Sequence, residues 1–163
     1  LEDATHDEVS AARDAGADFF LFDDGRSHAS ALRVEEIGAV LLLGADQDEQ
    51  RLRSVAPIDL DAMLVEAEAD VITVREQIEL RRVASITGAT IVIRSTGRPN
   101  ASILEAWRDA GAPAVVVPAA DVGTTLEAAG QVPAPRRSDE RRLPLLGGLV
   151  QESDHDHDDA DDS

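Results

Sequence analysis

Acidic and basic side chains follow several short apolar runs of this 163-residue sequence. Asp23 and Asp24 come directly after one run, Glu66 and Glu68 close another, and Arg94 follows a third. Mg²⁺ prefers oxygen ligands and is bound in proteins through one or two carboxylates plus water and substrate oxygens. These residue types predict a catalytic site made of Asp23, Glu66, Glu68 and Arg94. In it, Asp23, Asp24 and Glu66 bind Mg²⁺ and Arg94 binds a small anionic substrate.

A second candidate site follows Arg94 directly. Ser95, Thr96, Gly97 and Arg98 precede Pro99-Asn100, where a helix is expected to begin. Backbone amides at a helix start attract anions, and an arginine adds a charged fork, so these four residues are predicted to bind phosphate. The stretch is not a Walker loop, and no Gly-x-Gly-x-x-Gly motif occurs in the chain.

The same residue types also have purely structural uses. Carboxylates that follow strands are ordinary helix caps, a use open to Asp23, Asp46 and Asp48. Arg94 can instead neutralise Glu66 or Glu68, because side chains alternate along a strand and place these residues on one side of their strands. Both interpretations stay open at the level of the sequence.

The elements that must position these residues alternate regularly along the chain. Short apolar runs are followed by helix-compatible segments at intervals of about 20 to 28 residues. Such alternation predicts parallel strands joined by right-handed helical crossovers. The predicted strands are 18–22, 39–43, 62–66, 90–93 and 114–117. Helices with both ends predicted are 5–15, 71–87, 102–110 and 124–129. Two further helices are expected: a short one from Ser27 or Ser30 to 37, and one that is capped by Asp46 or Asp48 and ends at 55.

Several helix ends carry recognisable signals. Thr5 with Glu8 forms the pattern of a capping box. Gly16, Gly88 and Gly111 each follow a helix directly, where glycine adopts the left-handed conformation that a Cβ opposes. The helix 71–87 is predicted to bury a stripe that includes Val74, Ile78, Leu80 and Val83.

The fold class is therefore α/β, with a parallel sheet of about five strands alternating with helices. It is expected to be a partial or variant (β/α) barrel, with a flavodoxin-like three-layer sandwich as the alternative. In either arrangement ligands bind at the carboxyl ends of the strands, where Asp23, Glu66 and Arg94 are expected. The first helix belongs to a unit whose strand is missing, and the chain starts with Leu. Both features suggest a processed or partial chain, or a domain completed by another copy.

Two families share features with this pattern. The phrase Ala15-Gly16-Ala17-Asp18 before a strand, echoed at Ala110-Gly111-Ala112, resembles the units of (β/α)8 barrels of the TIM type. That resemblance implies a site on the face where strands run into helices.

The chain is also similar, more weakly, to response-regulator receiver domains. The acidic pair Asp23-Asp24, then Glu66 or Glu68, then Ser95-Thr96 and finally Val117-Pro118 follow the order of the receiver site. Glu stands in place of the phosphoacceptor Asp, and Val117 in place of a Lys. The resemblance thus implies a degenerate receiver that does not accept phosphate.

Composition excludes several functions. There is no Cys, so disulfides, thiolate nucleophiles and cysteine-ligated metals are excluded. The net charge is −18, all 15 basic residues are Arg, and such an acidic surface repels nucleic acid and anionic lipid. No apolar run approaches the roughly 20 residues of a membrane span. We expect a soluble, cytoplasmic protein that binds neither nucleic acid nor membrane.

The sequence divides into three parts. Residues 1–130 form the α/β domain, 131–150 a Pro- and Arg-rich linker with an apolar peptide, and 151–163 an acidic tail expected to be disordered. The apolar peptide 143–150 is expected to dock on its own domain or on a partner.

The expected function is non-catalytic, through self-association into a homo-oligomer or through a protein partner. The alternative is a Mg²⁺-assisted enzyme acting on a small phosphorylated or carboxylated metabolite.

Overall fold

The computed structural model describes residues 3–44 and 47–135. Its elements, in chain order, are α1 (His6–Asp14), β1 (Phe19–Phe22), the 3₁₀ helix η1 (Ala29–Arg33), β2 (Gly38–Leu42), α2 (Glu49–Val55), β3 (Ala62–Ala67), α3 (Val74–Thr87), β4 (Thr90–Ser95), α4 (Ala101–Asp109), β5 (Ala114–Val116), the 3₁₀ helix η2 (Ala119–Asp121) and α5 (Val122–Gly130). The predicted alternation of strands and helices is confirmed in type and order.

Local side-chain chemistry fixes the helix ends. Thr5 and Thr73 each form a complete capping box, with Glu8 and Glu76 respectively. Asp48 caps α2 by accepting from two backbone amides, and Asn100 caps α4. Capping satisfies the amide donors that the first helical turn leaves without an intrahelical partner. Helices α1 to α4 therefore begin where the sequence supplies a side-chain oxygen acceptor, whereas α5 begins without a side-chain capping bond.

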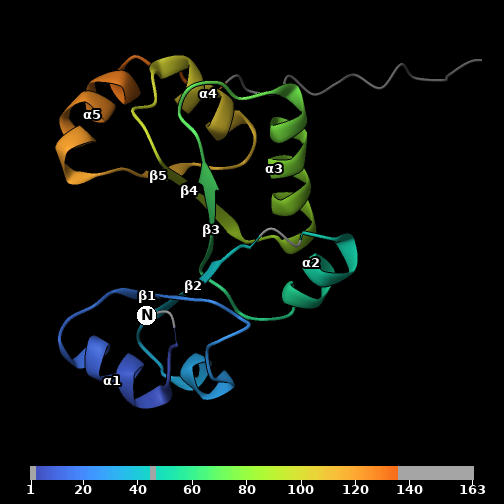
Figure 1. Cartoon of the computed structure of the whole chain (residues 1–163), viewed down its shortest axis with the longest axis vertical. Coiled ribbons are helices and arrows are strands. Elements are labelled where there is room, and N and C mark those ends of the chain that lie inside the picture. Colours follow the sequence, from blue (N-terminus) through green and yellow to red (C-terminus); the bar gives the residue numbers. More distant parts are fainter. Residues whose placement is uncertain (1–2, 45–46, 136–163) are drawn as a thin grey trace, which may run out of the picture.

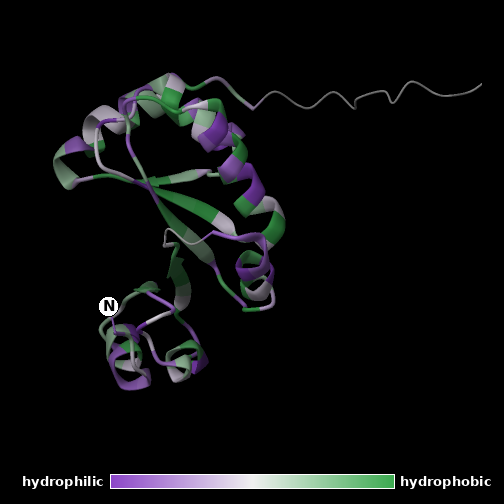
Figure 2. Cartoon of the chain, turned by 45° about the vertical axis from the view of Figure 1, so that its right-hand side comes forward, coloured by the Kyte–Doolittle hydropathy of each residue, from purple (hydrophilic) through white to green (hydrophobic). Residues whose placement is uncertain are grey.

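Five parallel strands form one sheet, in the order β1-β2-β3-β4-β5. Sequential order is that of consecutive βα units of a (β/α) barrel, whereas the flavodoxin-like order is 2-1-3-4-5. The sheet stays open, and Figures 1 and 2 show the helices along the outside of an arc and the strands along its inside. The domain is thus a partial barrel.

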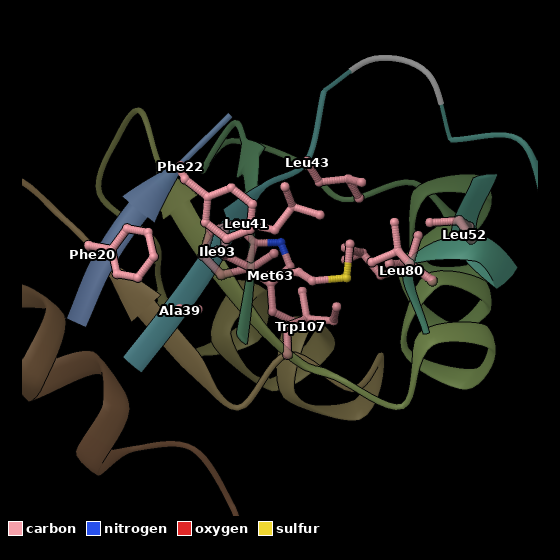
Figure 3. Close-up of a cluster of buried hydrophobic side chains, with 14 of the residues drawn as sticks. Phe20, Phe22, Ala39, Leu41, Leu43, Leu52, Met63, Leu80, Ile93 and Trp107 are labelled. Carbon is pink, nitrogen blue, oxygen red and sulfur yellow. The ribbon is translucent and has the colours of Figure 1, made fainter. Parts of the chain in front are cut away.

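The main core lies between the sheet and its helices. Phe20 and Phe22 of β1, Met63 of β3 and Ile93 of β4 point toward the helices, where Trp107 of α4 is 2% exposed (Figure 3). Aliphatic residues fill most of this core, as a composition of 2% aromatic residues predicts. The core thereby fixes the helices on the outer face.

A second, smaller cluster lies on the opposite side of the sheet. We define the inner face by apolar side chains at paired positions of the five strands: Phe19, Leu21, Val40, Leu42, Ala62, Leu64, Val92, Ala114 and Val116. Its buried members, Val40, Ala62 and Leu64, pack only with other strand residues. Among the described residues, no helix contributes to this cluster.

Three local predictions were wrong. The stretch after β1 forms a five-residue 3₁₀ helix that ends at Arg33, and Gly38, expected to end a helix, begins β2. Helix α3 begins at Val74, because Thr73 caps it, and not at 71. Val74 and Ile78 were predicted to be buried but are 73% and 58% exposed, since α3 packs through Leu80 and Val83.

In the described part of the chain, no helix is long and apolar enough to cross a membrane. Residues 131–135 follow α5, whereas the rest of the predicted linker, the apolar peptide and the acidic tail lie outside the described residues.

Candidate functional site

The carboxyl ends of β3 and β4 place one acidic and one basic side chain next to each other. Glu66 and Arg94 occupy paired positions of the two strands, and their side chains form an ion pair with an N–O distance of 3.2 Å. Their side chains are 58% and 55% exposed. The neutralising role for Arg94, one of two that the sequence left open, is therefore present in the structure.

The acids after β1 make contacts of their own. Asp23 accepts a hydrogen bond from the backbone of Gly25 at 2.8 Å, which closes a tight turn. Both carboxylate oxygens of Asp24 lie 2.8 Å from Nη2 of Arg51, a residue of α2. Among the residues that the structure describes, no three His, Asp or Glu side chains form a group that could hold a metal ion. Asp23, Asp24 and Glu66, the predicted Mg²⁺ ligands, thus do not assemble into such a group.

The predicted phosphate-binding residues form a loop after β4. The Ser95 hydroxyl is buried and donates to the carbonyl of Gly97 at 2.9 Å. Thr96 donates its backbone amide to Ala67 at 3.2 Å, which ties the loop to the end of β3. Arg98 forms an ion pair with Asp121 of η2. Within the described contacts, the loop is held by internal bonds and by one acid.

A cleft of about 610 Å³ opens beside the end of β3. Val65, Ile72, Leu80 and Trp107 supply its apolar walls. Its polar lining is mainly acidic, with the carboxylates of Glu66, Glu68, Glu76 and Glu79 against Arg75, together with Gln47 and Thr96. A smaller hollow of about 330 Å³ shares Gln47, Val65 and Glu66 with it. Glu66, Glu68 and Thr96 are thus the predicted site residues that the structure gathers around one cavity.

Most acids of this cleft already have partners. Glu79 pairs with Arg82 at 2.8 Å. Glu76 accepts from the Thr73 backbone at 2.6 Å and from its hydroxyl at 2.8 Å, and these two bonds lower the pKa of Glu76 below its usual value. Both Glu76 and Glu79 therefore serve α3 itself, as a cap and as an intrahelical pair.

The sequence did not indicate that α3 and α4 form one side of this cleft. Leu80 was predicted to be a core residue, but neither Leu80 nor Trp107 was predicted to line a cavity. Arg51 and Asp121, the partners of Asp24 and Arg98, were also missed. Each partner lies more than 20 residues from its acid or base along the chain, so no local pattern indicates it.

Comparison with known proteins adds no family. No protein-family model matches this chain, and no curated protein matches its sequence.

Proposed function

We propose that this protein is a non-catalytic α/β module that works by association through the inner face of its sheet. One observation carries the proposal: the helices pack on the other face, while the inner-face cluster within the described residues consists only of strand side chains. In a closed (β/α) barrel such side chains are buried in a packed interior. In this partial barrel the central side chains bury one another, and binding another polypeptide would cover the exposed ones at the two borders.

The exposure of side chains on the inner face is lowest at the centre of the sheet and highest on its two border strands. Leu64, at the centre, is 3% exposed, whereas Phe19 on β1 and Val116 on β5 are 58% and 48% exposed. Burying a large apolar side chain completely contributes about 1.5–3 kcal/mol. The two border strands therefore offer the apolar area that a partner would gain by covering the inner face.

Charge also favours a protein partner at this face. The charged side chains at its paired positions, Glu66 and Arg94, neutralise each other. The inner face is thus apolar and close to neutral on a chain whose net charge is −18. A second copy of the chain meets no like charge there, and nucleic acid finds no basic patch to bind.

Sedimentation equilibrium over a wide range of protein concentration tests this proposal on the full chain. Phe19→Asp and Val116→Asp are expected to weaken self-association at least about tenfold each, because each places a charge on the apolar face. Ile78→Asp is the matched control, since Ile78 is as exposed as Phe19 but lies on α3. A chain that stays monomeric at every concentration, or equal effects of all three substitutions, would contradict the proposal.

The cleft at the end of β3 favours a second function, binding of a small molecule. Its position is the one where parallel α/β sheets bind ligands, and Glu68 and Thr96 lie on its wall. Thermal unfolding with Mg²⁺ and a panel of phosphorylated and carboxylated metabolites tests it. A ligand at a hundred times its dissociation constant adds about 2.7 kcal/mol of stability, which moves the midpoint by several degrees. A shift retained in both Glu68→Gln and Thr96→Ala would contradict binding in the cleft.

A further inference from the structure

The strongest unexplained features are the inner face and the apolar segment Leu143–Val150, which reads Leu-Pro-Leu-Leu-Gly-Gly-Leu-Val. We propose that this segment covers the inner face of its own chain beside β5 and competes there with the partner. This inference rests on the proposed function, because it names what occupies the association surface before a partner binds. Three observations support it.

The first observation is where the described chain ends. Arg108, near the end of α4, donates a hydrogen bond to the carbonyl of Pro133. Helix α4 leads through Gly111 into β5, so this bond holds the end of the described chain against the helix that precedes β5. In the described part of the chain, β5 is paired only with β4. With right-handed crossovers, a chain that returns from α5 to this point is placed to continue along β5.

The second observation is the length of the connection. Residues 136–142 separate the last described residue, Pro135, from Leu143. Fully extended, the eight Cα–Cα steps from Pro135 to Leu143 span at most about 29 Å. Five strands at a spacing of about 4.8 Å extend about 19 Å from β1 to β5. The connection can therefore span a distance greater than the width of the sheet, which is the reach that a placement beside β5 requires.

The third observation is charge. The described residues contain 22 acids and 11 arginines, whereas residues 136–142 contain four arginines and two acids. The connection is thus basic and the domain acidic, which attracts the connection toward the domain surface. The segment itself carries no charged side chain and matches the apolar inner face.

Paramagnetic relaxation on the full chain tests this placement. The chain has no Cys, so Gly148→Cys provides a single attachment point for a spin label. We expect loss of the methyl signals of Val92 and Val116, which lie on the inner face beside and on β5. A label at Ala11→Cys, exposed on α1 beside the opposite border of the sheet, is the control and should leave these signals intact. Intact signals with the Gly148→Cys label would overturn the inference.

A mixed sample distinguishes the chain's own segment from that of a second copy. Spin-labelled chain without isotopes is combined with isotope-labelled chain without Cys. If the methyl signals of Val92 and Val116 are lost in this mixture, the segment crosses between copies and the intramolecular placement is wrong. If the signals are retained in the mixture but lost when one chain carries both the spin label and the isotopes, the intramolecular placement is supported.

Self-association of the variant Leu145→Asp/Leu146→Asp separates this inference from the proposed function. Release of the segment should strengthen association about tenfold or more, because the inner face no longer has an internal competitor. If association depends on Phe19 and Val116 but is unchanged by this variant, the inference fails and the proposed function stands. If neither Phe19→Asp nor Val116→Asp affects association, the proposed function itself fails.

Discussion

At the scale of single residues, the charged groups of the carboxyl edge are arranged mostly in exposed pairs. Glu66 with Arg94, and Asp24 with Arg51, join residues of different elements. Exposed pairs of this kind contribute only about 0–1 kcal/mol each to stability. Their main effect is to neutralise Glu66 and Asp24 locally, which leaves Glu68 as the acid of the cleft for which the described residues give neither an ion pair nor a side-chain hydrogen bond.

Gly88 illustrates how one residue type is required by backbone geometry. Its φ is +68°, and an added Cβ would meet no atom within 4 Å, so the cost of a side chain is conformational only. We predict that Gly88→Ala lowers the free energy of unfolding by about 1–2 kcal/mol. Gly123 in α5 is the control, because its surroundings are equally open and its φ is not positive. Gly123→Ala should be neutral or stabilising by up to about 1 kcal/mol in urea unfolding.

At the scale of elements, α3 lines the cleft and belongs to the outer helical layer. One capping box, at Thr73, stabilises its first turn. We predict that Thr73→Ala lowers the free energy of unfolding by about 1 kcal/mol, because the amide of Glu76 loses its acceptor. Thr73→Ser keeps a hydroxyl and should recover most of this loss. Equal urea midpoints for Thr73→Ala and the unsubstituted chain would show that the cap does not stabilise α3.

The same capping box gives a pH dependence with a defined sign. Because the Thr73 bonds lower the pKa of Glu76 in the folded state, its carboxylate stabilises the fold at any pH above the usual glutamate range. That contribution is lost as the pH falls through the lowered pKa. The stability difference between the unsubstituted chain and Glu76→Gln should therefore be largest at neutral pH and shrink in acid. A difference that grows on acidification would contradict this origin.

At the scale of the whole molecule, an apolar face is combined with a strongly acidic surface. Two copies with a net charge of −18 repel each other, and salt screens this repulsion over a Debye length of about 10 Å at 0.1 M. We predict that self-association strengthens as NaCl is raised, because apolar contact is not screened. Sedimentation equilibrium at low and high salt measures it, with Phe19→Asp as the control. Weaker association in high salt would indicate an interface made of ion pairs.

The sequence by itself determined the local structure of this protein. Element order, most element types, the glycine helix ends, the capping box at Thr5 and the α/β class with parallel strands all follow from patterns within a few residues. These rules act locally, because helix propensity, capping and strand alternation depend on neighbours in the chain. The 3₁₀ turn after β1 escaped them, since it is too short to show a helical period.

Only the tertiary structure decided which residues meet and which face is left open. The pairing of Asp24 with Arg51 and of Arg98 with Asp121 depends on strand register and on where each helix packs. The exposure of Val74 and Ile78 depends on which side of α3 meets the core. The helix residues of the main core all lie on the outer face of the sheet. The reason is the sequential strand order, because crossovers of one hand place every helix on the same side. These contacts join residues distant in the chain, so their geometry is set by the assembled fold.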